Sequence, residues 1–249
     1  NEPERDLYSK FQSLLKGNAN FFDVIVGYFR TSGFFRMCDA LSEVEKIRIL
    51  VGLNVDKLTA EIIAREKYSS LFSPTLKIAK ESFAKTVKKE FDESEVTREI
   101  EYGVQKFLEW LKSGKLEIRL YAQAPLHAKV YVMRKSEKEI TADIDSVITG
   151  SSNFSEAGLI SNLEFNVELK DYEDIKFAYE KFEELWKNGE PVDGEYIEVV
   201  QKETWLNSDI TPYEIYLKTL YEFFKEEINA DQEIELENLL PENFIRLKY

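Results

Sequence analysis

The chain has 249 residues, 43% of them hydrophobic, and a formal net charge of −14. That length suffices for one large domain, or for one domain with an appendage, and no apolar run approaches the roughly 18 residues of a membrane span. The N-terminus lacks a secretory signal, and a single cysteine, Cys38, cannot form an internal disulfide, so we expect a cytoplasmic protein. With one cysteine and one histidine, we expect neither a metal site nor a cofactor.

The acidic charge is concentrated in the second part of the sequence. Residues 1–159 contain 24 Lys/Arg and 24 Asp/Glu, whereas residues 160–249 contain 9 and 23. A neutral first part can carry a local basic groove, but the acidic part repels phosphate backbones. We therefore do not expect the chain alone to bind nucleic acid strongly and non-specifically.

Short apolar runs alternate with stretches of helical spacing in the first part, a pattern typical of an α/β domain. The expected strands are 22–29, 47–53, 116–121, 126–133, 146–149 and 163–169. Helices are expected up to about Leu41, within 56–112 with an interruption at Ser73-Pro74, and over 174–188. The last of these carries an apolar stripe of Phe177, Phe182, Leu185 and Trp186.

The character of the sequence changes after Gly189-Glu-Pro191. Residues 1–190 are expected to form the main domain, and residues 191–249 an acidic loop, a helix and a linker. Thr211-Pro212-Tyr213-Glu214 combines a capping Thr, a Pro at the first helical position and a Glu at the third. These residues predict a helix that continues to about Ile228.

Polar residues alternate with apolar ones along the predicted strand 126–133. His127, Lys129 and Tyr131 would point to one face, which places His127 and Lys129 about 6.5–7 Å apart along the strand. An imidazole and an ammonium at that separation can contact one phosphate. A lone strand histidine is more often structural, and His-x-Lys alone is a weak motif.

Two later segments extend this pattern. Val147-Ile-Thr149 leads into Gly150-Ser151-Ser152-Asn153, where the glycine permits close backbone approach and the hydroxyls and amide can bind phosphate oxygens. In the predicted strand 163–169, Leu163, Phe165 and Val167 are expected to point inward, so that Asn162, Glu164 and Asn166 share the polar face. Gly-Ser-Ser-Asn alone is a plausible turn, but the three segments together favour a functional site.

The combination resembles the motif of the phospholipase D superfamily, H-x-K-(x)4-D-(x)6-G-S-x-N. His127, Lys129, Gly150, Ser151 and Asn153 match it, and Glu164 resembles the acidic residue found downstream. Arg134 occupies the expected aspartate position, whereas Asp143 has the right spacing counted back from Gly150. Asp143 either replaces that aspartate or is a solvated hairpin residue.

The likeness also includes Gly27-Tyr-Phe-Arg-Thr-Ser-Gly33 and Gly150-Ser-Ser-Asn-Phe-Ser-Glu-Ala-Gly-Leu159. These segments look like the phospholipase D-like module at the N-terminus of certain bacterial and archaeal Swi/Snf-type helicases. The resemblance implies a mixed, largely buried sheet with helices on both faces and a C-terminal helical appendage. It also implies that a helicase/ATPase domain follows in the full-length protein, with DNA as the expected partner.

The resemblance implies a metal-independent phosphodiesterase reaction through a phosphohistidine. That reaction uses two histidines, and this chain has one, so we expect a homodimer that pools His127 with its symmetry mate. His127 would be nucleophile and acid/base, Lys129 and Asn153 would bind phosphate, Ser151 would support them, and Glu164 would orient His127.

Gly150, Ser152, Asn166 and Arg30 are additional candidate substrate contacts. Arg30 and Arg36 either line a phosphate groove or are ordinary surface arginines, and the neighbouring aromatic residues, including Tyr28, favour core packing over base stacking.

Two alternatives to a DNA nuclease stay open. The chain could be an inactive dimerisation or nucleic-acid-binding module of a helicase, which the displaced aspartate and the acidic tail favour. A lipid phosphodiesterase ranks third, because no basic amphipathic stretch suggests membrane binding.

Overall fold

The computed structural model describes residues 6–52, 74–94, 97–137, 139–141, 143–192, 211–221 and 223–224. The chain forms two compact units, residues 1–207 and residues 208–249. The first unit contains all the strands of the described residues and all the candidate site residues.

A seven-stranded mixed sheet forms the centre of the first unit, in the order β6-β5-β4-β1-β2-β3-β7. Neighbouring strands β1, β2 and β3 are parallel, and the other pairs are antiparallel. The strands are β1 (Phe21–Val26), β2 (Lys46–Gly52), β3 (Leu116–Tyr121), β4 (Lys129–Arg134), β5 (Ser146–Gly150), β6 (Asn166–Leu169) and β7 (Glu190–Pro191). The mixed α/β fold expected from the sequence is confirmed.

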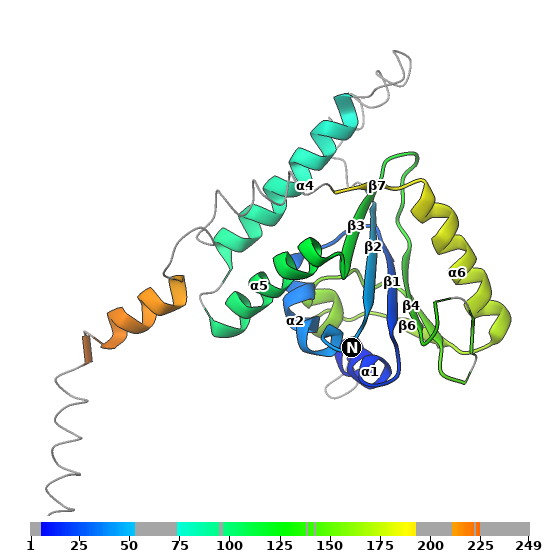
Figure 1. Cartoon of the computed structure of the whole chain (residues 1–249), viewed down its shortest axis with the longest axis horizontal. Helices are drawn as coiled ribbons and strands as arrows, with labels where there is room; N and C mark the ends of the chain where they lie inside the picture. Colours follow the sequence, from blue (N-terminus) through cyan, green and yellow to red (C-terminus); the bar gives the residue numbers. More distant parts are fainter. Residues whose placement is uncertain are drawn as a thin grey trace, which may run out of the picture. The chain divides into compact units, whose positions relative to one another are not determined.

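Helices cover both faces of this sheet (Figure 1). Residues of α1 (Leu7–Leu15), α2 (Thr31–Leu41), α4 (Pro74–Glu93), α5 (Arg98–Ser113) and the π-helical turn η1 (Ala157–Ser161) share the large core on one face. The other face packs against α6 (Tyr172–Lys187). The predicted helical stretch 56–112 is thus two helices from residue 74 onward, and its earlier part, 56–73, lies outside the described residues.

Strand β1 is buried on both faces, which explains its nearly continuous apolar sequence. Val24 and Val26 belong to the large core, while Ile25 packs under α6. The exception is Asp23, which is fully buried and accepts charged hydrogen bonds from Arg48 and Arg134. A buried carboxylate is tolerated only with such partners.

The aromatic residues around the start of α2 pack in the core, as favoured above. Phe29, Phe34 and Phe35 are all buried, with Phe34 in edge-to-face contact with Phe107. Cys38 is also buried.

Two expectations about apolar side chains are wrong. Phe177 is 64% exposed, because the buried stripe of α6 is Ile175, Phe182 and Trp186 at helical spacing. Leu163 and Phe165 are 92% and 77% exposed, because they precede β6, whose pairing with β5 begins only at Asn166. Val167, 39% exposed, is also directed outward.

The described part of the second unit is a helix that includes residues 212–221. Its predicted start is confirmed, since Thr211 Oγ1 accepts from the Glu214 amide and the Glu214 carboxylate accepts from the Thr211 amide. Its predicted continuation to Ile228 lies outside the described residues. Within the described residues of the whole chain, no helix has the length and apolarity needed to cross a membrane.

Candidate functional site

The candidate residues meet at one end of the sheet. Strand register places Val26 of β1 beside Lys129 of β4, and Gly150 of β5 beside Asn166 of β6. β1 and β5 end here, whereas β4 and β6 begin here. Segments separated by more than a hundred residues are therefore brought to the same end of the sheet.

His127 differs from the sequence prediction in one respect, because β4 begins at Lys129 rather than at residue 126. His127 lies in the irregular segment before the strand, and its side chain is exposed. This segment crosses close to β1 and β2, since a Cβ atom on Gly52 would lie 2.3 Å from the carbonyl oxygen of Leu126. Glycine at this position therefore lets residues 126–127 reach the edge of the sheet.

His127 and Lys129 nevertheless contact one another. The ammonium Nζ of Lys129 lies 3.0 Å from His127 Nδ1 and donates to the His127 carbonyl oxygen at 2.8 Å. When Lys129 donates to Nδ1, the imidazole proton is on Nε2, so this tautomer is a proton donor. Burial lowers the pKa of Lys129 below its usual value, and the nearby Glu164 carboxylate opposes that shift.

The loop after β5 is fixed by hydrogen bonds to the start of β6. Ser151 N donates to the Phe165 carbonyl at 3.1 Å, and Phe165 N donates to Ser151 Oγ at 3.0 Å. Gly150 permits this approach, because a Cβ atom there would lie 2.2 Å from the Phe165 carbonyl oxygen. The close backbone approach expected at Gly150 is confirmed.

Ser152 and Asn166 bind each other within this loop. Asn166 Nδ2 lies 2.8 Å from Ser152 Oγ, and Ser152 N donates to Asn166 Oδ1 at 3.4 Å. Ser152 is fully buried, and its carbonyl accepts a 2.8 Å hydrogen bond from the phenol of Tyr131. This geometry makes Ser152 and Asn166 supports of the loop, and Tyr131 is a support that sequence reasoning missed.

Asn153 is the loop residue with an unpaired buried acceptor. Its side-chain Oδ1 is buried and has no hydrogen-bond partner among the described residues. A buried polar atom without a partner is uncommon in folded proteins and points to a function or a bound species.

Glu164 lies beside the loop that follows β5. Its carboxylate accepts from Ser151 Oγ and, at 3.3 Å, from Asn162 Nδ2. It contributes to the electrostatic environment of Lys129 and of buried Tyr131, which places its charge close to the site. Within one chain, the atom that contacts His127 Nδ1 is the Nζ of Lys129.

Arg30 lies beside this group of residues. Its amide donates to the Phe154 carbonyl at 2.9 Å, and its guanidinium lies 4.7 Å from the Tyr28 ring centroid. The guanidinium also pairs with Glu90 of α4 at 2.6 Å. Arg30 is therefore held at the margin of the site.

The residues discussed for the displaced aspartate lie elsewhere. Arg134, 1% exposed, is at the far end of β4 from Lys129 and pairs with Asp23 at 2.8 Å. Asp143 is exposed in a turn, in agreement with the solvated-hairpin alternative. Asp145, which sequence spacing did not indicate, is buried and accepts from the amides of Lys135 and Thr141, so it closes the β4–β5 connection.

The chain's sequence matches the model of a protein family over residues 13–186. That family is described as the PLD-like domain of cardiolipin synthase. Because the match covers well over half of the chain, the protein belongs to this phospholipase D-like family. No curated protein matches the sequence significantly.

Among solved structures, the chain is similar to Nuc from Salmonella typhimurium, a phospholipase D family member, with 14% identity and a TM-score of 0.40 over 73% of this chain and 88% of that one. It is similar to NucT from Helicobacter pylori, with 12% identity and a TM-score of 0.41 over 76% and 92% of the two chains. It is also similar to the phosphatidylserine synthase of Haemophilus influenzae Rd KW20, with 16% identity and a TM-score of 0.44 over 92% and 44%.

Proposed function

We propose that the protein is a metal-independent phosphodiesterase that cleaves DNA through a site shared by two copies of the chain. Family membership supports the reaction class. The observation that carries the proposal is the contact of Lys129 Nζ with His127 Nδ1 at 3.0 Å, at a sheet edge that also holds Asn153. A DNA substrate rests on the resemblance of segments 27–33 and 150–159 to the helicase-associated module, and a helicase/ATPase domain of the full-length protein is part of the proposal.

The reaction proceeds by two displacements at phosphorus. His127 Nε2 attacks and forms a phosphorus–nitrogen bond, while the bond to the leaving oxygen breaks. The partner subunit's His127 gives its proton to that oxygen, then takes a proton from water, which attacks phosphorus and releases His127. Lys129 and Asn153 stabilise the charge on the phosphoryl oxygens.

The tautomer of His127 must change before His127 can act as the nucleophile. Attack from Nε2 requires the imidazole proton on Nδ1. A protonated Lys129 cannot accept a hydrogen bond from that N–H group. A carboxylate can accept this hydrogen bond, and Glu164 lies close enough to affect the pKa of Lys129. We therefore propose that phosphate binding moves Lys129 from Nδ1 onto the substrate and that a Glu164 carboxylate of the dimer replaces it.

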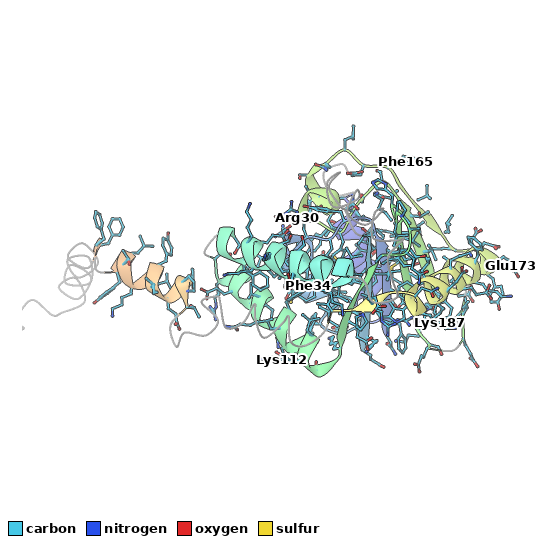
Figure 2. All side chains as sticks on the ribbon, turned by 90° about the horizontal axis from the view of Figure 1, so that it is seen from above. Arg30, Phe34, Lys112, Phe165, Glu173 and Lys187 are labelled. Atoms are coloured by element: carbon cyan, nitrogen blue, oxygen red, sulfur yellow. The ribbon has the colours of Figure 1, made fainter. Side chains whose placement is uncertain are left out.

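The dimer proposal is supported by the exposure of the segments that precede β4 and β6. His127 is exposed, and Leu163 and Phe165 flank Glu164 with exposed fractions of 92% and 77%. Large apolar side chains next to polar site residues are typical of association surfaces. Figure 2 labels Phe165 on the loop that precedes β6.

The test is hydrolysis of bis(p-nitrophenyl) phosphate and of plasmid DNA in the presence of EDTA. His127→Ala is expected to lower both rates by on the order of 10³-fold or more, because it removes nucleophile and acid together. Gln123→Ala, on the same exposed segment, is the matched control and keeps both rates. Cleavage retained by His127→Ala, or abolished by EDTA in the unsubstituted protein, contradicts the proposal.

The alternative is an inactive module that dimerises or binds nucleic acid. It is favoured by Arg134 at the expected aspartate position and by the acidic charge of residues 160–249. Binding of DNA by the unsubstituted protein without any hydrolysis of either substrate in EDTA would select this alternative.

A further inference from the structure

A second concavity adjoins the candidate site. It has a volume of about 800 Å³ and lies between the start of α2, the end of α4, the start of α5 and the segment 155–157. That volume is within the range typical of sites for small organic ligands. We call it the α2–α5 groove.

Two chain segments join the groove to the candidate site. Tyr28, which lines the groove, follows Gly27, where an added Cβ atom would lie 3.2 Å from His127 Cα. Ser155, which also lines it, is two residues beyond Asn153. A substrate phosphate held by His127 and Asn153 would therefore place its neighbouring group at the entrance of the groove.

The charges of the groove do not suit a phosphate backbone. Two arginines, Arg30 and Arg36, face three carboxylates, Glu90, Glu99 and Glu156, so the formal balance is +2 − 3 = −1. Phosphate binding by electrostatic attraction requires a positive surface. A fatty acyl chain is not favoured either, because the lining residues are mostly hydroxyl-bearing or charged.

The same residues suit a nucleobase. The Tyr28 ring lines the groove with the Arg30 guanidinium over one of its faces, 4.7 Å from the ring centroid, and aromatic rings and guanidinium planes both stack on bases. Carboxylates and hydroxyls accept hydrogen bonds from the exocyclic amino groups of bases, and guanidinium groups donate to their ring nitrogens and carbonyls. The groove therefore presents a stacking surface together with both kinds of hydrogen-bonding group.

The two arginines differ in how firmly they are held. Glu90 accepts from Arg30 at 2.6 Å and from both the amide and the hydroxyl of Thr31 at 2.7 Å, so Arg30 has a fixed position. Arg36 pairs with the 64% exposed Glu99 at 3.3 Å, and its guanidinium also lies 5.3 Å from the Tyr8 ring centroid. An exposed pair of this kind is weak. Arg36 is thus the residue that a ligand can recruit.

We propose that the α2–α5 groove binds an unpaired nucleobase of the nucleotide next to the cleaved phosphate, so that the protein prefers single-stranded substrate. The base stacks on the Tyr28–Arg30 pair and hydrogen-bonds with Arg36 and Glu99. In a duplex, the faces of the bases are stacked on one another and are closed to Tyr28. This inference rests on the proposed function for the nature of the substrate.

The experiment measures binding of a short fluorescein-labelled single strand of DNA, and of its duplex, by fluorescence anisotropy in EDTA. Tyr28→Leu and Arg36→Gln are expected to raise the single-strand dissociation constant by on the order of tenfold. Tyr102→Leu is the matched control, since Tyr102 is a 44% exposed tyrosine on α5 with Lys106 Nζ 5.8 Å from its ring centroid, outside the groove. Circular dichroism checks that each variant is folded. If the Tyr28→Leu protein is not folded, the Arg36→Gln protein still tests the groove.

The inference is overturned if both groove variants bind the single strand as tightly as the Tyr102→Leu protein does, or if the duplex binds more tightly than the single strand. Hydrolysis of bis(p-nitrophenyl) phosphate, which has no base, separates this result from the proposed function. Loss of single-strand binding in the groove variants supports the groove even if that diester is not hydrolysed. Hydrolysis of the diester together with unchanged single-strand binding overturns the groove alone.

Discussion

The phenol of Tyr131 donates a 2.8 Å hydrogen bond to the backbone carbonyl of Ser152, and neither residue is exposed to solvent. Ser152 lies between Ser151 and Asn153, the two loop residues that match the family motif. The bond therefore joins the centre of β4 to the loop that presents the candidate phosphate ligands. Burial raises the pKa of Tyr131, so the phenol stays protonated and able to donate well above neutral pH.

Tyr131→Phe removes this bond and leaves a buried carbonyl without a partner. The free energy of unfolding is expected to fall by about 1–3 kcal/mol. Denaturant titration checks this, with Tyr121→Phe as control, because Tyr121 is partly buried on the α6 side and its hydroxyl makes no hydrogen bond within the described residues. Equal losses in the two variants would show that the Tyr131 bond does not stabilise the loop.

Restoring the family's aspartate at position 134 is expected to damage the protein. Arg134→Asp would place a carboxylate beside fully buried Asp23 and remove the hydrogen bonds to Asp23 and to the carbonyls of Ser136 and Glu137. Breaking a buried ion pair costs about 3–5 kcal/mol.

Thermal unfolding measures the effect, and Lys85→Asp on the exposed face of α4 is the control for the charge change. An Arg134→Asp protein that is as stable as the unsubstituted one would contradict the structural role given to Arg134.

Stability is expected to fall in alkaline solution. Burial raises the pKa of the Cys38 thiol from 9.0 to about 12, so the folded state retains a proton that the unfolded chain loses. The corresponding stabilisation is fully present below pH 9 and is lost as pH rises from about 9 to about 12, at about 1.4 kcal/mol per pH unit at most.

Denaturant titrations across that range test the alkaline loss, and Cys38→Ala should have a shallower decline. The same decline in both proteins would assign the pH dependence to other groups, of which Tyr131 is the first candidate because burial raises its pKa as well.

The exposed apolar residues beside Glu164 are expected to form the dimer contact. Phe165→Ser should raise the dimer dissociation constant at least tenfold, since an aromatic residue central to an interface contributes about 2 kcal/mol or more. Sedimentation velocity measures this. Phe177→Ser, with a 64% exposed phenylalanine on α6, is the matched control. A monomeric unsubstituted protein, or equal effects of the two variants, would contradict this interface.

Two patterns were enough to predict β1 and β4, which carry the site: β1, buried on both faces, is a nearly continuous apolar run, and β4 alternates apolar with polar residues. Spacing along a strand predicted that His127 and Lys129 lie about 6.5–7 Å apart on one face. His127 instead precedes the strand, and Lys129 Nζ lies 3.0 Å from His127 Nδ1. The outward orientation of Leu163 and Phe165 could not be predicted, because alternation alone does not show which face of an edge strand is covered. The pairing of Arg134 with Asp23 could not be predicted, because the two residues are 111 positions apart in the sequence. The supporting role of Tyr131 could not be predicted either, because it depends on a hydrogen bond to the backbone of Ser152.

The central claim is that catalysis needs the histidines of two chains. It is tested most directly by mixing the unsubstituted protein with increasing amounts of the His127→Ala protein under conditions that exchange subunits, and measuring hydrolysis of bis(p-nitrophenyl) phosphate per unsubstituted chain. The account predicts that this specific activity falls in proportion to the fraction of unsubstituted chains, because only dimers with two histidines are active. A specific activity that stays constant across the mixtures would show that each chain works alone, and would contradict the shared site.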